Sequence, residues 1–268
     1  PLHDMRIFAG EVICADIFTD NRLMLGVGRG AFAYEMNRLG VSMESSREKF
    51  DESLNLLQAL LNEEEVSWNG KYYQFEPLTI MPRPVSDIPI MMGVLIPEAI
   101  YHCTKRGFHI QTTPLSGDHQ HMLNQVDAFT RAREEMADDG KHLTLSMSRV
   151  AFLSTSDADR KAKIRMAHDY YGRFDNVFTG PGIVDNGMIR PLPRQMSLDE
   201  TASNLTICTA GEMIDKLEPY AEAGVDRFIM NVNFGVSQAE TLESIQRFAE
   251  EVMPHFTANI EPLKQTAG

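Results

Sequence analysis

The segment with the clearest chemical potential is Gly28-Arg29-Gly30, which follows directly on an apolar run from Leu23 to Val27. Arginine offers a planar cationic group that suits phosphate, and flanking glycines let the backbone approach a bulky ligand closely. We therefore predict that Gly28, Arg29 and Gly30 bind a phosphate group at the end of a strand. The alternative is an ordinary strand-to-loop turn with a solvated arginine, because glycine is common in turns. Neither familiar glycine-rich nucleotide motif, G-x-G-x-x-G or G-x-x-x-x-G-K-S/T, can be written over this segment.

Other apolar runs end in residues that are polar or small but carry no charge. These junctions are Gly93-Val94-Leu95, Thr112-Thr113 and the stretch from Asn231 to Gly235. A hydrolase or a glycosidase would need titratable groups here, whereas a cofactor that carries the reaction itself needs a dry, mostly neutral pocket. The junctions therefore favour a cofactor site. Two simpler explanations stay open, namely the strand propensity of threonine and a satisfied pair of asparagines, Asn231 and Asn233.

Short apolar runs alternate with amphipathic segments along the whole chain. Alternation of this kind predicts βαβ units and a parallel sheet, which is the α/β class. The predicted strands are Leu23–Gly28, Pro89–Gly93, His109–Thr113, Leu145–Ser154, Arg227–Asn233 and a short one near Leu205–Cys208. Residues Val66 to Phe75 instead predict a β-hairpin that turns at Asn69-Gly70.

Helix starts and one long irregular stretch complete the predicted organisation. Capping boxes are expected at Ser45-x-x-Glu48, Thr209-x-x-Glu212 and Ser237-x-x-Glu240, and Pro97 suits the first turn of another helix. The stretch from Arg173 to Ser197 is rich in glycine and proline. A loop of that length inside a compact domain is typical of a functional lid, which is our interpretation.

Charge and cysteine usage restrict the partners of this protein. A formal net charge of −13 argues against nucleic acid and anionic membrane surfaces. Cys14, Cys103 and Cys208 lie far apart without a C-x-x-C motif, which indicates a reducing compartment and no metal site. No apolar run approaches the ~20 residues of a membrane span, and no signal-peptide pattern opens the chain. We therefore expect a cytoplasmic protein.

Four stretches of the sequence are distinctive in their order and spacing. They are Pro1-Leu-His-Asp4, the segment from Asp16 to Gly30, the segment from Val66 to Tyr73, and a unit formed by Pro89-Ile90, Pro97-Glu98 and Gly107-Phe108. Together they resemble segments of the bacterial luciferase-like flavin monooxygenase family. The resemblance covers the chain from Pro1 to about Phe256.

The resemblance implies a (β/α)8 barrel in which residues 1–268 form a single domain and residues 173–197 form a lid. The first three strands of the family precede the Pro-Leu-His segment and have no counterpart in this sequence. At about 30 residues per βα unit, roughly 90 residues are absent. We therefore expect the natural protein to be longer than the sequence given.

The implied activity is that of a flavin-dependent monooxygenase, which uses reduced FMN and O2 to oxygenate a small organic substrate. A separate flavin reductase would supply the reduced FMN. A methionine-rich, weakly charged rim suggests an apolar substrate. Two alternatives stay open: an F420-dependent oxidoreductase that transfers hydride, and a non-catalytic flavin-binding partner subunit. A homodimer is expected because the family is commonly dimeric.

The resemblance also assigns roles to individual residues. Arg29 corresponds to the family arginine that contacts the flavin phosphate, and His3 falls near the active-site rim as a candidate catalytic residue. Many members carry small hydroxyl residues before the Pro-Glu of Pro97-Glu98, where this chain has Val94, Leu95 and Ile96. Phosphate contacts there would be limited to backbone N–H groups. The remaining assignments are Gly28, Gly30, Gly93, Val94, Leu95, Thr112 and Thr113 to the cofactor, and Phe32, Tyr34 and Asn231 to the substrate or lid.

Overall fold

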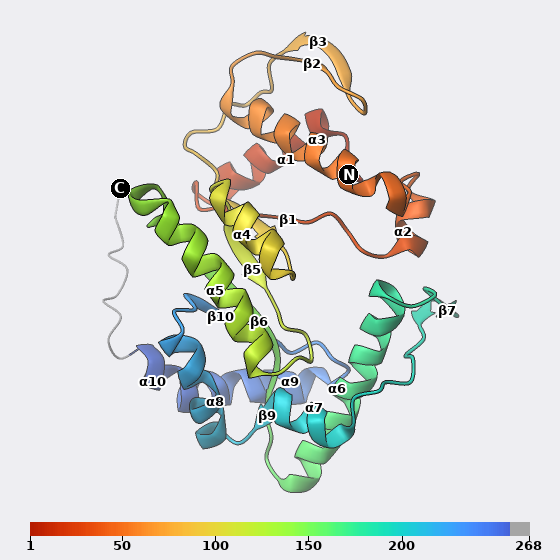
Figure 1. The fold of residues 1–268 in the computed structure, drawn as a ribbon, viewed down its shortest axis with the longest axis vertical. Coiled ribbons are helices and arrows are strands. Elements are labelled where there is room, and N and C mark those ends of the chain that lie inside the picture. The colour runs from red at the N-terminus through yellow and green to blue at the C-terminus, as the bar shows by residue number, and fades with distance from the viewer. Residues whose placement is uncertain (258–268) are drawn as a thin grey trace.

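A computed structural model describes residues 1–257, and its centre is a parallel sheet (Figure 1). Every strand pair in this sheet is parallel, as expected for short apolar runs that are covered by helices. The α/β class predicted from the sequence is confirmed. In spatial order the strands are β1 (Leu25–Val27), β4 (Ile90–Gly93), β5 (His109–Thr112), β6 (Leu145–Leu153) and β10 (Arg227–Asn231), and β9 (Thr206–Cys208) pairs with the end of β6.

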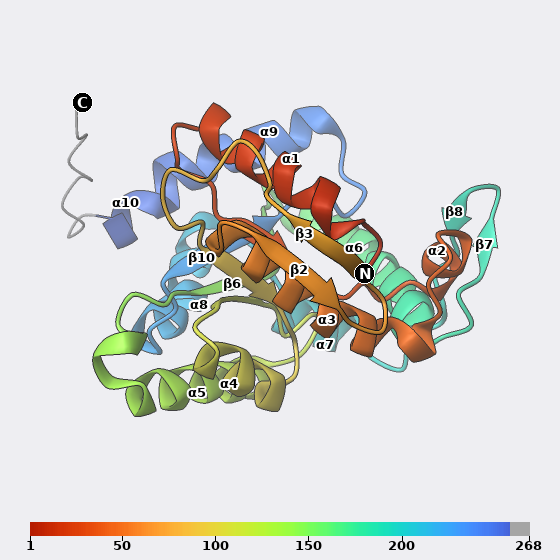
Figure 2. The same ribbon diagram turned by 90° about the horizontal axis from the view of Figure 1, so that it is seen from above.

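One face of the sheet is covered by α4 (Pro97–Lys105), α5 (His119–Glu135) and α8 (Ala210–Glu222). Figure 2 shows α4 and α5 lying side by side. The core between these layers includes Ile110 and Phe129, which are almost completely buried. This core fixes the strands in register and so positions their carboxyl ends.

The remaining helical elements pack around the rest of the sheet, except that Val252 of η2 (Phe248–Val252) belongs to the core just described. α1 (Met5–Phe18) packs on α3 (Met43–Asn62) in a second apolar cluster. A third cluster joins β6 and β9 to α6. The other helical elements are α2 (Ala33–Arg38), η1 (Ala137–Gly140), α6 (Asp157–Phe178), α7 (Leu198–Asn204), α9 (Gln238–Arg247), the π-helical η2 (Phe248–Val252) and α10 (Met253–Thr257).

The sheet is open at both edges within residues 1–257. β1 pairs only with β4, and β10 pairs only with β6, so the described strands do not close a barrel. The part of the expected domain that comprises residues 258–268 lies outside the described residues. In the described part of the chain, no helix is both long enough and apolar enough to cross a bilayer.

Two of the three predicted capping boxes are confirmed, and the third is wrong. Thr209 with Glu212 and Ser237 with Glu240 form reciprocal caps at α8 and α9. At α3 the N-cap is Ser42, whose side chain accepts a hydrogen bond from the Ser45 N–H, so the helix begins one turn earlier than expected. Ser42 and Ser45 could each cap this helix, and in the structure the earlier residue, Ser42, is the cap.

The predicted hairpin exists, but its turn differs from the expected one. β2 (Val66–Asn69) and β3 (Gln74–Leu78) are antiparallel, and Asn69 pairs with Gln74, so four residues rather than two form the loop. The Glu52 carboxylate of α3 accepts hydrogen bonds from the backbone N–H groups of residues 71–73. This tertiary anchor stabilises the wider loop over a tight Asn-Gly turn.

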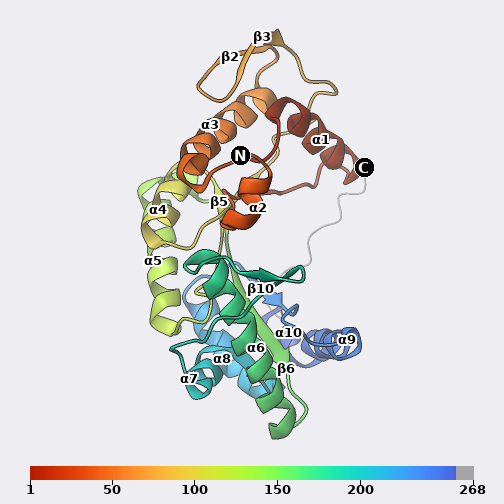
Figure 3. The same ribbon diagram turned by 90° about the vertical axis from the view of Figure 1, so that its right-hand side faces the viewer.

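The predicted lid segment is shorter than expected. Residues 173–178 belong to α6, which ends at Phe178, so the irregular segment begins at Thr179. This segment contains a small antiparallel hairpin, β7 (Val184–Asp185) and β8 (Met188–Ile189). We call residues 179–197 the loop segment. Its hairpin lies beside α2 in all three ribbon views (Figures 1, 2 and 3).

Candidate functional site

A cavity of about 340 Å³ lies at the carboxyl ends of β1, β4, β5 and β10 and against the middle of the longer β6. Parallel α/β sheets bind ligands at this end, because the loops that follow the strands converge there. We call this cavity the strand-end cavity. It is lined by Gly26, Val27, Met91, Gly93, Val94, Leu95, Gln111, Thr112, Thr113, Leu115, Ser148, Arg149, Val150, Tyr170, Tyr171, Phe174 and Asn231.

The structure brings together six of the residues singled out from the sequence. Gly93, Val94 and Leu95 reach the strand-end cavity from the end of β4, and Asn231 reaches it from the last residue of β10. Thr112 and Thr113 contribute from the end of β5. Their common position follows from the parallel topology, because each residue ends or follows a strand of the same sheet.

Thr112 carries a polar atom that lacks a partner. The residue is 2% exposed, and its Oγ1 makes no hydrogen bond within the described structure. A buried hydroxyl without a partner is costly, and such a group at a cavity wall indicates a missing ligand or an ordered water. Arg149 of the same wall is also 2% exposed, and its Nε lacks a partner as well, so Thr112 and Arg149 both leave a buried polar atom open to a ligand.

Arg29 lies at the same end of the sheet but outside the wall of the strand-end cavity. Its Nη1 donates to Ser46 Oγ of α3 at 3.2 Å, and the residue is half-buried. Gly30, directly after it, has a φ of +85°, a conformation that glycine adopts without strain. The chain turns at Gly30, and Arg29 keeps further N–H groups that could bind an anion near the rim.

Phe32 and Tyr34 stack on each other at a centroid distance of 5.4 Å, beside the loop segment. A Cβ placed on Gly182 would lie 3.8 Å from Phe32 Cε2. The loop segment and the start of α2 are therefore neighbours. Neither aromatic ring belongs to the wall of the strand-end cavity, so both lie outside it.

His3 lies apart from the strand-end cavity. Its ring stacks on Phe8 at 5.1 Å, and it lines a separate cavity of about 170 Å³ between α1 and α3. The two cavities share Gly26 and Val27 of β1 in their walls. The structure thus places His3 on the side of β1 that faces α1, next to the unpaired sheet edge.

Sequence reasoning missed the contribution of α6 to the cavity wall. Tyr170, Tyr171 and Phe174 all line it. The Tyr171 hydroxyl donates to the Leu115 carbonyl at 3.0 Å, and burial raises the pKa of this phenol well above its ordinary value. The available signal was the aromatic spacing Tyr170, Phe174, Phe178, which puts three rings on one face of a helix.

The base of the loop segment is fastened to α6. Asn176, which is completely buried, donates to the carbonyls of Ile183 and Arg190 and accepts from the Ile183 N–H. Arg194 donates to the Asp175 carboxylate at 2.8 Å and to Ser116 Oγ at 2.6 Å. These contacts hold the loop segment to α6 on both sides of the β7–β8 hairpin.

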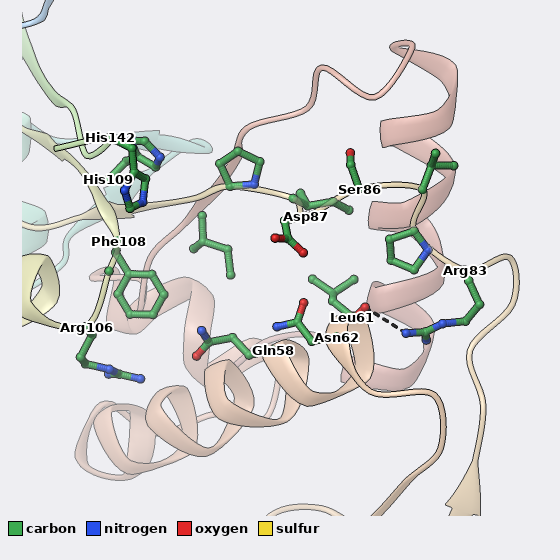
Figure 4. A pocket seen from close by; sticks show the side chains of 16 residues that line it. Gln58, Leu61, Asn62, Arg83, Ser86, Asp87, Arg106, Phe108, His109 and His142 are labelled. Carbon is green, nitrogen blue, oxygen red and sulfur yellow. Dashed lines mark hydrogen bonds between the residues drawn. The ribbon is translucent and has the colours of Figure 1, made fainter. Parts of the chain in front are cut away.

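A larger cavity of about 610 Å³ lies at the opposite, amino-terminal end of β4 and β5 (Figure 4). Its arginines are committed to structural contacts. Arg83 donates to the carbonyls of Leu60 and Leu61 at the end of α3, and Arg106 donates to Asn55 Oδ1 at 3.0 Å. Because ligand chemistry in this architecture lies at the carboxyl ends of strands, we assign the candidate site to the smaller cavity. In the part of the chain that the structure covers, no cluster of metal-ligating residues occurs.

The comparisons with known proteins agree on a family. Residues 1–227 match the family description "Luciferase-like monooxygenase". The chain is 25% identical over 260 residues to the oxygenase component of the flavin-dependent trigonelline monooxygenase of Acinetobacter baylyi, covering 93% of this chain and 72% of that protein. It is 23% identical over 245 residues to an F420-dependent glucose-6-phosphate dehydrogenase of Nakamurella multipartita, covering 88% and 69%.

A solved structure shows the same fold. The monooxygenase RslO1 from Streptomyces bottropensis superposes with a TM-score of 0.72 at 19% identity, covering 95% of this chain and 75% of that one. The chain belongs to the luciferase-like monooxygenase family, as the sequence resemblance predicted. The expected class, an oxidoreductase of this family, is confirmed as well.

Proposed function

We propose that this protein is the oxygenase of a two-component system, which uses reduced FMN and O2 to oxygenate a small, largely apolar organic substrate. The observation that most supports this proposal is the strand-end cavity, whose wall is mostly neutral and contains the unpartnered Thr112 hydroxyl. A relative named as an oxygenase component supports a separate flavin reductase as the partner. The substrate, a homodimeric state and a cytoplasmic location are parts of the same proposal.

The residues present fit a flavin. Thr112 offers a buried hydrogen-bonding group, and Gly93 lets the backbone approach a flat ring. At the start of α4 the N-cap Ile96 makes no side-chain cap and Pro97 has no N–H, so the backbone N–H groups of Glu98 and Ala99 are the ones available to a phosphate. Arg29 would add a cationic partner at this end of the sheet. Gly28 and Gly30 flank it, and Val94, Leu95 and Thr113 would complete the cofactor contacts.

The protein's own contribution would be binding, orientation and exclusion of water. Reduced flavin supplies the electrons for O2 chemistry when it is bound. The apolar wall of Val27, Met91 and Val150 keeps the reacting region dry. The loop segment, next to Phe32 and Tyr34, would limit solvent entry above it. His3 remains a proposed catalytic residue that would need a closed barrel to bring it near the flavin.

We further propose that the sheet is part of a single (β/α)8 barrel domain in which additional strands pair with β1 and β10. The edges of the sheet support this. Both strands have an unpaired edge within residues 1–257, and such edges invite pairing. Hydrogen exchange on the natural protein would test this, because closure predicts protected N–H groups along both edges.

The proposed activity is tested by O2 uptake and product analysis with a flavin reductase, NADH and FMN. Trigonelline is the first substrate to try, because a relative is named for it. It is a zwitterion, so its turnover would support the monooxygenase activity but contradict the proposed apolar substrate. Incorporation of one ¹⁸O atom from ¹⁸O2 into a product is the expected result. A relative that is F420-dependent favours a second candidate, hydride transfer to or from F420. Substrate-dependent bleaching of oxidised F420 without O2 consumption would select it, and flavin binding without turnover would select a partner subunit.

A further inference from the structure

Two residues of the strand-end cavity wall, Asn231 and Tyr170, take part in a directed chain of hydrogen bonds. The Asn233 backbone N–H donates to Asn231 Oδ1 at 3.3 Å, and this contact orients the Asn231 amide. Asn231 Nδ2 then donates to the Tyr170 hydroxyl oxygen at 2.8 Å. Because the Tyr170 oxygen accepts this bond, its own proton is available to donate. No acceptor for that proton occurs among residues 1–257.

Tyr170 belongs to a row of aromatic rings along α6. The Tyr170 and Phe174 rings lie 4.9 Å apart, and both residues line the cavity. Phe174 stacks on Phe178 at 5.5 Å, and Phe178 is 44% exposed. We call Tyr170, Phe174 and Phe178 the aromatic ladder. A row of rings that only filled a core would not leave two members at a cavity wall and a third in solvent.

We infer that the aromatic ladder and the Tyr170–Asn231 pair bind a planar aromatic substrate that presents a carbonyl oxygen. Phe174 would stack on the ring, since offset and edge contacts between rings are favoured beyond simple burial. The Tyr170 O–H would donate to the carbonyl oxygen, and Asn231 would hold Tyr170 in the donor orientation. This inference rests on the proposed function, because it names the class of substrate for the same cavity.

The test compares two probes of similar size, benzamide and cyclohexanecarboxamide, by calorimetric titration of the natural protein. Both carry the same carbonyl acceptor, but only benzamide has an aromatic ring. Benzamide should bind about three- to tenfold more tightly. Equal affinity for the two probes, or no detectable binding of benzamide, would overturn the inference.

Three variants separate the roles of the residues. Tyr170→Phe should weaken benzamide binding about three- to tenfold while keeping the preference for the aromatic probe. Phe174→Leu should instead remove that preference. Tyr72→Phe is the matched control, because it deletes a hydroxyl of the distant hairpin loop that donates to Glu48 of α3. It should change neither the benzamide affinity nor the preference for the aromatic probe. An unchanged benzamide affinity in Tyr170→Phe contradicts the inference.

Asn231→Asp tests the direction of the hydrogen bond. A carboxylate at this position would accept the Tyr170 proton, so benzamide should lose as much affinity as in Tyr170→Phe although both polar groups remain. A benzamide affinity in Asn231→Asp equal to that of the wild type would contradict the inference. Competition between FMN and benzamide would also contradict it, because it would assign the aromatic ladder to the flavin ring. FMN titration of the same samples separates the two proposals. Failure to bind FMN would contradict the proposed function. The benzamide result would then still decide whether the aromatic ladder binds an aromatic carbonyl compound.

Discussion

Arg194 donates a hydrogen bond from Nε to Asp175 Oδ2 at 2.8 Å, and this ion pair fastens the end of the loop segment to α6. The Arg194 side chain is only 7% exposed, so the pair is shielded on the arginine side. α6 also supplies Tyr170 and Phe174 to the strand-end cavity. One helix therefore both shapes the cavity and anchors the segment proposed to cover it.

Asn176→Ala should open the base of the loop segment. The substitution removes three hydrogen bonds, to Ile183 and Arg190, and leaves buried backbone groups unpaired. A loss of about 2–3 kcal/mol is expected from unpaired buried groups. Trypsin should then cut after Arg194 faster than in the wild type, whereas the bond after Arg190 resists trypsin because Pro191 follows it. Asp185→Asn breaks only an exposed ion pair with Arg190 and should leave the cutting rate unchanged.

Gly172→Ala should destabilise the protein although the position is helical. A Cβ on Gly172 would lie 2.7 Å from the Leu192 carbonyl oxygen, so the loop segment would have to shift. Gly211→Ala in α8 is the matched control, because no atom lies within 4 Å of a Cβ placed there. That control should be neutral or stabilising by up to about 1 kcal/mol. Urea unfolding of both variants checks the prediction, and equal effects would contradict it.

Stability should fall below neutral pH in part because of His109. Its Nδ1 accepts from the Thr144 N–H, and burial, followed by nearby His142 and Arg227, lowers the pKa of His109 below 6.5. The unfolded chain then binds a proton more readily than the folded one, so stability is lost as the pH falls through 6.5 toward the folded-state pKa.

The variant His109→Asn keeps an acceptor for the Thr144 N–H but cannot titrate. Its free energy of unfolding should fall less than that of the wild type between about pH 7.5 and pH 5.5. His119→Asn, at an exposed position, should keep the wild-type slope. Urea denaturation at both pH values measures these free energies of unfolding. If the free energy changes equally with pH in all three proteins, groups other than His109 cause the pH dependence.

Local patterns predicted the sheet well, because buried parallel strands are short apolar runs that end near glycine or polar residues. The observed strands lie within or close to the predicted ranges, as β6 at Leu145–Leu153 shows for a prediction of Leu145–Ser154. Residues at the carboxyl ends of the strands, such as Thr112 and Asn231, could be assigned to one site because parallel strands end together. These are consequences of topology that the chain order already contains.

Long-range contacts were beyond sequence reasoning. Tyr170 and Asn231 are 61 residues apart, and no local pattern announces their hydrogen bond. Glu52 widens the hairpin loop from another element, which is why the Asn69-Gly70 signal misplaced the turn. The cap of α3 failed for a different reason, since Ser42 and Ser45 are both competent caps and packing of the helix selects between them.

We expect this end of the sheet to bind FMN through its phosphate, with Arg29 as a partner. Titration with FMN and riboflavin by fluorescence quenching tests it most directly, using wild type, Arg29→Gln and the exposed control Arg38→Gln. Wild type and Arg38→Gln should prefer FMN over riboflavin about ten- to hundredfold, and Arg29→Gln should lose most of that preference. Equal affinities of the wild type for FMN and riboflavin, or an unchanged preference in Arg29→Gln, would contradict the account.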